Sequence, residues 1–264
     1  MPEAKSPEFW NLIDRAAKVE KVSEGFRFTE GPVFSRRGYL LFSDIPSNRI
    51  MKYERGKVTV FRENSNAANG LTFDHQGRLL ACEKGRVTRT EKNGQITVLA
   101  SEGLEGPNDL VYAIDGSIYF TDLPKGLVYQ IPRRGQAKVV ARDNVRPNGV
   151  ALAPNQQKLY VADVNKEKPV VRVYEIAPDG TLGQGRVFCE VRTDGLKSDE
   201  AGNVWLSSAG GVHVYDASGR QLGLVDTPEQ PANCCWGSGF AGLYITARTS
   251  LYHIPTKVHG TRTY

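Results

Sequence analysis

One short motif recurs six times along the chain, and its spacing limits the possible folds more than any other feature. Each copy has a polar residue, an apolar run, a turn and a second apolar run, as in Glu30–Phe34 followed by Tyr39–Asp44. The polar residues that head the copies, called the leading residues below, are Glu30, Asn69, Asn108, Asn148, Asp194 and Asn233. Successive leading residues are 39, 39, 40, 46 and 39 positions apart. Such a period indicates a repeated structural unit.

Each of the first five copies is followed by two more strand-like segments, such as Arg49–Tyr53 and Val58–Phe61 in the first. Four strands in about 40 residues are typical of a β-propeller blade. The sixth copy has a third strand at Ser250–Ile254 and then a short tail, whereas Lys18–Val22 is a strand without a partner. Pairing the two would close the ring and remove an open edge. We therefore predict an all-β fold, a single six-bladed β-propeller domain over residues 1–264 with four-stranded blades.

The first 17 residues precede this repeat and have a different pattern. Ser6 and Pro7 resemble a helix start, with a capping hydroxyl and a proline in the first turn. Phe9 and the apolar residues after it recur at helical spacing. The prediction is an N-terminal helical extension over 1–17, with one short helix from about Pro7 to Ala17 that packs against the propeller.

The composition argues against several classes of partner. The net charge is +5, but the basic residues are scattered and form no stripe with interleaved aromatics, so no nucleic-acid partner is expected. The N-terminus lacks a signal-peptide pattern and no apolar run could span a bilayer, so we expect a cytoplasmic protein without a membrane partner. The four cysteines lack metal-type spacing, and the adjacent Cys234 and Cys235 would point to opposite faces of a strand, so reduced thiols are expected.

Propeller topology brings the leading residues together at one end of the central channel, because strands within a blade alternate in direction. A turn-forming role would account for Asn69 and Asn233, but it explains Glu30 poorly, since glutamate is not a preferred turn residue. Two carboxylates and two amide oxygens make an all-oxygen ligand set for a hard divalent cation. The predicted metal ligands are Glu30, Asn108, Asn148 and Asp194.

At these residues the sequence resembles the senescence-marker-protein/gluconolactonase/luciferin-regenerating-enzyme family. The similar stretches are Glu30–Pro32, Phe42–Pro46, Pro107–Asp109, Tyr119–Asp122, Pro147–Gly149 and Asp194–Lys197. Asn233–Cys234 and Tyr244–Tyr252 resemble the bacterial gluconolactonases in particular. The resemblance implies a six-bladed propeller, a divalent metal in the channel and hydrolysis of a sugar lactone to the aldonic acid.

The resemblance also implies roles for single residues. Glu30, Asn148 and Asp194 match the family's metal ligands, and Asn108 matches a further ligand or substrate contact. Some members carry an arginine two positions before that asparagine, where this chain has Gly106. Calcium is the expected cation, and Mg²⁺, Mn²⁺, Zn²⁺ and Fe²⁺ remain alternatives.

The hypothesis for the mechanism gives Asp194 the catalytic role of base on an attacking water. The residues expected to hold sugar hydroxyls are Asn69, Asn108 and Asp122.

Two other functions stay open at this point. The same metal site could hydrolyse organophosphorus or other esters, and turnover of a fluorophosphate against gluconolactone would separate the two activities. Alternatively, the propeller could be a non-catalytic binding module, which would need no pairing of Glu30 with Asp194. One fold hosts many functions, so the architecture alone does not decide among the three.

Overall fold

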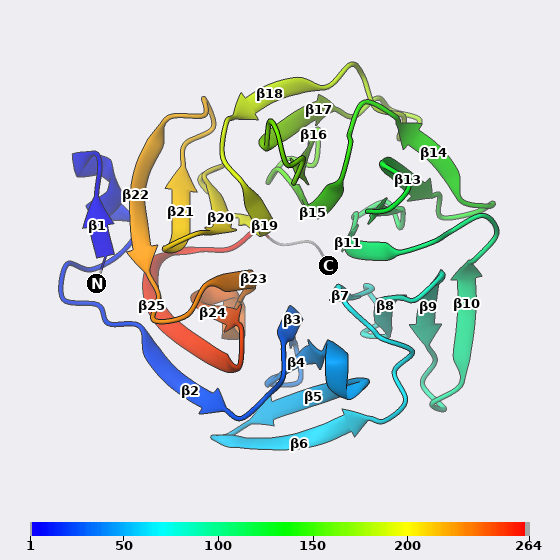
Figure 1. Ribbon diagram of the computed structural model, residues 1–264, viewed down its shortest axis with the longest axis horizontal. Coiled ribbons are helices and arrows are strands. Elements are labelled where there is room, and N and C mark those ends of the chain that lie inside the picture. The colour runs from blue at the N-terminus through cyan, green and yellow to red at the C-terminus, as the bar shows by residue number, and fades with distance from the viewer. Residues whose placement is uncertain (1, 262–264) are drawn as a thin grey trace.

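The chain winds into a ring of antiparallel sheets around a central channel (Figure 1). The computed structural model describes residues 2–261. Within that range the strands form six sheets, one for each copy of the sequence motif. In every sheet the strand that carries the leading residue, or begins just after it, lies nearest the axis, and the later strands follow outward. The prediction of a six-bladed propeller is confirmed.

The first three blades follow one another along the chain without interruption. The first comprises β3 (Thr29–Ser35), β4 (Tyr39–Asp44), β5 (Arg49–Glu54) and β6 (Lys57–Arg62). The second comprises β7 (Leu71–Phe73), β8 (Leu79–Glu83), β9 (Arg86–Thr90) and β10 (Ile96–Ala100). The third comprises β11 (Pro107–Tyr112), β12 (Ile118–Asp122), β13 (Leu127–Ile131) and β14 (Lys138–Ala141).

The last three blades continue the ring. The fourth comprises β15 (Pro147–Leu152), β16 (Lys158–Asp163), β17 (Val170–Glu175) and β18 (Arg186–Cys189). The fifth comprises β19 (Thr193–Ser198), β20 (Val204–Ser208), β21 (Gly211–Tyr215) and β22 (Gln221–Asp226). The sixth comprises β23 (Pro231–Trp236), β24 (Ala241–Ala247), β25 (Ser250–His259) and an N-terminal strand, β2 (Glu20–Glu24). Short 3₁₀ turns stand at η2 (Ile45–Ser47) and η3 (Ser238–Phe240).

Two N-terminal strands join blades made by distant parts of the chain. The strand β2 pairs antiparallel with β25, with Lys21 opposite Tyr252, and so forms the outer strand of the sixth blade. It lies two residues further along the chain than the segment that the sequence marks. A second strand that the sequence did not predict, β1 (Pro2–Ala4), pairs with β22 and adds a fifth strand to the fifth blade.

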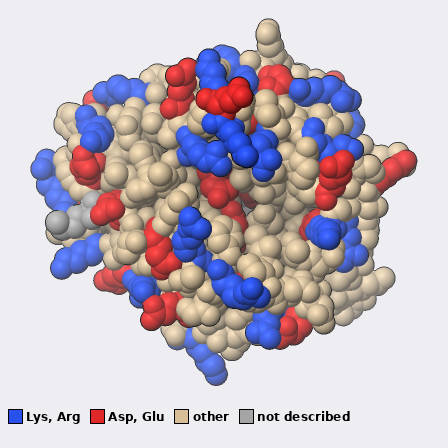
Figure 2. All heavy atoms as spheres, viewed as in Figure 1, with Lys and Arg blue, Asp and Glu red and all other residues tan. Residues whose placement is uncertain are grey.

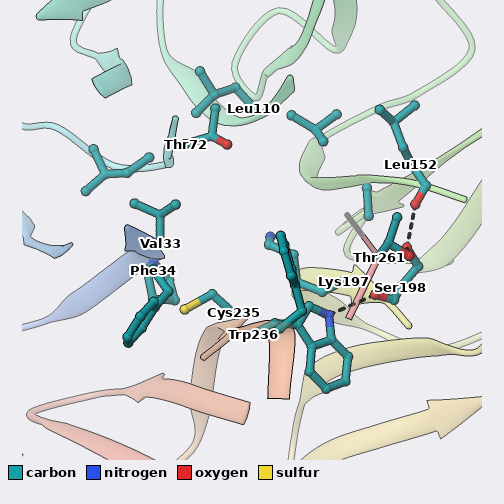
Figure 3. A pocket seen from close by; sticks show the side chains of 15 residues that line it. Val33, Phe34, Thr72, Leu110, Leu152, Lys197, Ser198, Cys235, Trp236 and Thr261 are labelled. Atoms are coloured by element: carbon teal, nitrogen blue, oxygen red, sulfur yellow. Dashed lines mark hydrogen bonds between the residues drawn. The ribbon is translucent and has the colours of Figure 1, made fainter. Parts of the chain in front are cut away.

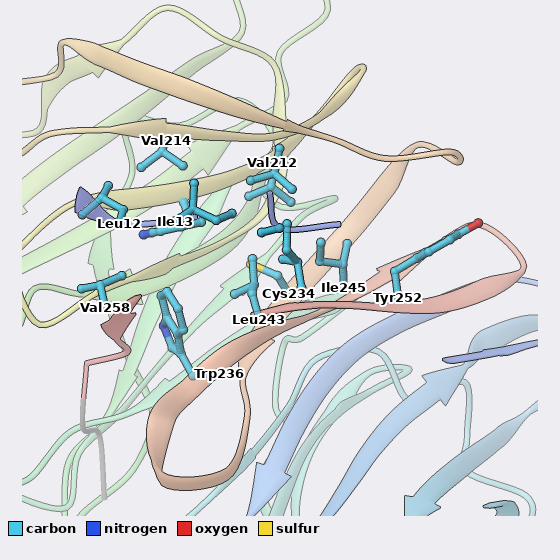
Figure 4. Close-up of a cluster of buried hydrophobic side chains, with 14 of the residues drawn as sticks. Leu12, Ile13, Val212, Val214, Cys234, Trp236, Leu243, Ile245, Tyr252 and Val258 are labelled. Atoms are coloured by element: carbon cyan, nitrogen blue, oxygen red, sulfur yellow. The ribbon is translucent and has the colours of Figure 1, made fainter. Parts of the chain in front are cut away.

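The predicted N-terminal helix is wrong in type and length. The segment forms a 3₁₀ helix, η1 (Pro7–Asn11), and Ser6 makes no side-chain cap. An isolated stretch of this length gains little from helix propensity, so packing decides its shape. Phe9 and Ile13 are fully buried against the fifth and sixth blades, in a cluster that also contains Val212 and Leu243 (Figure 4).

The first strand of most blades is irregular where it carries its leading residue. The pairing register with the second strand shifts between Glu30 and Val33 in the first blade, and between Pro147 and Val150 in the fourth. Equivalent shifts occur in the third, fifth and sixth blades. Such β-bulges release residues from the ladder and redirect their side chains. The bulges leave Asn108, Asn148 and Asp194 without a register partner, whereas Glu30 and Asn233 lie at the edge of the bulge and stay paired with Ser43 and Thr246.

Most of the core lies between neighbouring blades. One cluster, for example, joins Val111 and Tyr119 of the third blade to Val150 and Val161 of the fourth. All four cysteines are buried and unpaired, as the sequence predicts. Among the described residues, no helix has the length and apolarity needed to cross a membrane.

Candidate active site in the central channel

Neighbouring leading residues touch around the channel axis because glycines let the backbones approach. A Cβ atom on Gly31 would lie 1.9 Å from the backbone oxygen of Asn69, in the next blade. A Cβ atom on Gly149 would lie 2.4 Å from the backbone oxygen of Asp194, again in the next blade. No side chain could occupy that space without moving the backbone. Glycine residues thus allow the leading residues of neighbouring blades to approach one another closely at one end of the channel.

Contacts also cross the channel. The Asn233 amide nitrogen Nδ2 donates to Glu30 Oε2 at 3.2 Å and to Asp109 Oδ2 at 3.3 Å. Asn233 belongs to the sixth blade and Asp109 to the third, which stand opposite each other in the ring. The channel is therefore narrow enough at this level for single side chains to bridge it.

Glu30 is the most strongly perturbed acid in the channel. Only 3% of its surface is exposed. Burial raises the pKa of Glu30 well above its usual range, and the neighbouring carboxylates of Asp194 and Asp109 raise it further. Hydrogen bonds from the Gly31 N–H and from Asn233 act in the opposite direction but do not compensate. This rise in the pKa indicates that no positive charge near Glu30 offsets the cost of burying its carboxylate.

Asp194 is shifted in the same direction. Burial raises the pKa of Asp194 to about 6, a hydrogen bond from Asn148 lowers it, and the Asp109 charge raises it. Arg192 and Arg248 lower it from positions where both residues are exposed. In the space-filling view, acidic atoms occupy the central hollow and basic side chains surround it (Figure 2). The site therefore has acidic side chains at its centre and basic side chains around its edge, which is called the rim below.

Amide oxygens complete the ligand set that the sequence predicts. Asn148 is 9% exposed and Asn108 is half-buried. The buried side-chain oxygen of Asn69 accepts no hydrogen bond from the described residues. Residues 2–261 contain no group of three or more His, Cys, Asp or Glu side chains arranged to hold a metal. A cation here would need the amide oxygens together with the two carboxylates, and this oxygen-only chemistry fits a hard divalent ion.

Asp122 has a different environment from the other predicted site residues. It is fully buried, and its carboxylate accepts the backbone N–H groups of Glu105 at 2.9 Å and Gly106 at 3.1 Å. Asp44 and Asp163 hold the preceding loops of their own blades in the same way. This repeated arrangement accounts for Asp122, because both of its carboxylate oxygens already accept backbone N–H groups.

Gly106 also has a local explanation. A Cβ atom there would lie 2.9 Å from the ring carbons of Pro124. An arginine, which some family members carry two positions before the asparagine, would need Pro124 to move. Any equivalent substrate contact must therefore come from elsewhere in this chain.

Three residues of the site were not among the predicted site residues: Asp109, Lys197 and Asn233. The Lys197 ammonium group Nζ lies 3.8 Å from Asp109 Oδ2 and 3.3 Å from Asn233 Oδ1. A comparison of the six copies could have revealed two of them. Asp109 follows its leading residue where four other copies have glycine, and Lys197 is the one charged residue among the positions three after each leading residue.

The residues three positions after each leading residue line a cavity of about 70 Å³ along the axis (Figure 3). They are Val33, Thr72, Val111, Ala151, Lys197 and Trp236. The lining is otherwise apolar or uncharged. Lys197 therefore stands between an apolar cavity and the acidic site.

Comparison with known proteins identifies the family and supports the fold. Residues 28–249 match the family model described as the SMP-30/gluconolactonase/LRE-like region. A gluconolactonase of Zymomonas mobilis is 27% identical, over 97% of this chain and 86% of its own length. The structure of a gluconolactonase from Xanthomonas campestris is 29% identical with a TM-score of 0.90, covering 97% of this chain and 94% of that one. Regucalcin from Agrobacterium tumefaciens, at 18% identity and a TM-score of 0.82, shares the fold over 92% of this chain and 95% of its own. The chain belongs to the SMP-30/gluconolactonase/LRE-like family.

Proposed function

We propose that this protein is a divalent-metal-dependent lactonase that hydrolyses a sugar lactone to the aldonic acid. The observation that carries the proposal is that Glu30, which is buried, and Asp194, which is half-buried, interact in the channel and that the pKa of each is raised. Two carboxylates in such a site without a matching cation are costly, and a divalent ion would neutralise them. The gluconolactonases among the relatives support the lactone as substrate class.

The proposed ligands are Glu30, Asn108, Asn148 and Asp194, with calcium as the expected ion. When bound, a divalent cation supplies Lewis-acid polarisation of an ester carbonyl and stabilises developing negative charge. The side-chain oxygen of Asn69, which has no hydrogen-bond partner among the described residues, is proposed to receive a hydrogen bond from a sugar hydroxyl.

Asp194 is the proposed catalytic base. An ionised Asp194 with one oxygen not bound to the cation can accept a proton from water. The water oxygen then bonds to the lactone carbonyl carbon, the ring C–O bond breaks, and the proton ends on the departing ring oxygen. Asn148 orients Asp194 through their hydrogen bond. Asn108, which is half-buried, is the proposed substrate contact.

The test is a pH-drop assay over a panel of sugar lactones and one fluorophosphate. The wild type should lose lactone turnover after EDTA treatment and regain it with Ca²⁺. Asp194→Asn should lower kcat by roughly 10²–10⁴-fold. Asp179→Asn, at an exposed turn, is the control and should keep full activity.

The outcomes separate the three functions. Intact turnover and metal binding in Asp194→Asn would refute the role of this residue. Faster hydrolysis of the fluorophosphate would favour an organophosphorus hydrolase, and no metal-dependent hydrolysis at all would favour a binding module.

A further inference from the structure

The contacts of Lys197 differ from those of a surface lysine. Its side chain is 24% exposed, and Nζ reaches Asp109, Asn233 and the backbone oxygen of Leu196 at 2.9 Å. Asp109 is 3% exposed and lies across the channel, in the third blade. The ion pair Lys197–Asp109 thus links the fifth and third blades, which are not neighbours in the ring.

Lys197 also helps to orient the Asn233 amide, together with the Cys234 N–H. An ammonium group can only donate hydrogen bonds, so the group that faces it must be the Asn233 oxygen. The Asn233 nitrogen then faces the two carboxylates, Glu30 and Asp109, which as ionised groups only accept. The direction of the cross-channel bonds therefore follows from two donors to Asn233 Oδ1, the Lys197 ammonium group at 3.3 Å and the Cys234 N–H at 2.9 Å.

The charges in the channel interior can be counted. Glu30, Asp109 and Asp194 carry three negative charges when ionised, and Lys197 carries one positive charge. Two negative charges remain, which is the charge that a divalent cation neutralises. Arg192 and Arg248 act on Asp194 from the exposed rim, where solvent screens them.

We propose that Lys197 is a positioning residue that sets the charge of the channel interior to match a divalent cation. It offsets Asp109, helps to orient Asn233 and leaves Glu30 and Asp194 as the uncompensated pair. This inference rests on the proposed function, because it assumes that a cation binds there. Without Lys197 the interior would hold three negative charges and would favour a trivalent ion.

The experiment compares Ca²⁺ and Tb³⁺ binding by calorimetry and by terbium luminescence, with no substrate present. Lys197→Met keeps the length of the side chain and removes its charge. The ratio of Tb³⁺ affinity to Ca²⁺ affinity should rise roughly tenfold, because one unit charge acts over a few ångströms in a partly buried site. Lys166→Met removes the same charge from an exposed loop residue and should leave the ratio unchanged.

A double variant separates charge from loss of structure. Asp109→Asn combined with Lys197→Met restores two negative charges, so the affinity ratio should return toward the wild-type value. Lys197→Arg keeps the charge and should also stay near that value. Circular dichroism and the unfolding midpoint establish that each variant is folded before its affinities are compared.

The possible failures are distinguishable. If the wild type binds neither cation, the metal site of the proposed function is wrong. If the wild type binds Ca²⁺ but Lys197→Met has an unchanged affinity ratio, the role given to Lys197 is wrong. A ratio that rises equally in the single and double variants would also contradict it, because charge would then not be the cause.

Discussion

At the residue scale, the glycines of the motif have a role that their sequence context does not reveal. Asn-Gly and Asp-Gly pairs are typical of turns, yet of the glycines after leading residues only Gly31 has a positive φ, of 52°. Gly149 and Gly195 lie within β15 and β19, at the β-bulges of those strands. A Cβ atom on Gly195 would lie 2.0 Å from the Asn233 side chain. Close packing of neighbouring blades, rather than a turn, is what requires glycine there.

Gly149→Ala tests this role. The new methyl group would meet the backbone oxygen of Asp194, which is one of the proposed metal ligands. We expect a loss of about 1–3 kcal/mol in the free energy of unfolding, measured by urea titration, and weaker Ca²⁺ binding. The control is Gly183→Ala, where the nearest atom to the new Cβ would be 3.7 Å away, so stability should change little. Equal stability of the two variants would show that the contact is not tight.

At the element scale, a carboxylate anchors the turn between β24 and β25 at the edge of the sixth blade. Glu229 accepts the Thr249 N–H at 2.8 Å, the Tyr252 hydroxyl at 2.8 Å and the Ser250 hydroxyl. Partial burial alone raises the pKa of Glu229, but these bonds outweigh it and lower the pKa to about 2. A turn next to Arg248, which lies at the rim of the site, is thus held by one ionised side chain.

Glu229→Gln should therefore lower the free energy of unfolding by an amount that depends on pH. The folded pKa lies below the ordinary value of 4.5, so the stabilisation is fully present above pH 4.5 and is lost as pH falls toward 2. The wild type should be more stable than the variant at pH 7, and the difference should shrink below pH 4.5. Urea unfolding between pH 7 and 3.5 measures it. Glu167→Gln, in an exposed loop, should show no such trend; a difference that is constant with pH would contradict the assignment.

At the scale of the whole molecule, the N-terminal segment covers the sixth blade and completes it. The strand β2 occupies the outer edge of β25, and Phe9 and Ile13 fill the apolar space beside the fifth and sixth blades. Loss of a buried phenylalanine alone typically costs about 3–5 kcal/mol. An uncovered β25 would also expose unpaired backbone groups.

A variant that lacks residues 1–24 should lose most of its stability and associate in a concentration-dependent manner. A variant that lacks only residues 1–4 removes β1, an additional strand on an already four-stranded sheet, and should stay monomeric with a small change in unfolding midpoint. Size-exclusion chromatography and thermal unfolding compare the two. A monomeric, equally stable longer deletion would show that the N-terminal segment is dispensable.

Local pattern was sufficient for the architecture and for part of the site. The strand alternation and the unsuitability of Glu30 as a turn residue can be detected within short windows, and the period near 40 residues is found by comparing the six copies. These features indicated six blades and placed Glu30, Asn148 and Asp194 at one channel end. Blade number and the identity of the leading residues follow from repetition, which needs no knowledge of long-range contacts.

The tertiary structure decided which side chains contact one another in the site and which instead bond to nearby backbone groups. Asp109, Lys197 and Asn233 come from different blades, and only closure of the ring across a narrow axis joins them. Asp122 lies in a similar motif, but its carboxylate accepts hydrogen bonds from backbone N–H groups. The N-terminal segment forms a short 3₁₀ helix that buries Phe9 in place of the predicted longer helix. The sequence thus determined the six polar leading residues, whereas the folded ring determined their partners, because contacts across an axis depend on bulges and glycine-permitted packing far apart in the chain.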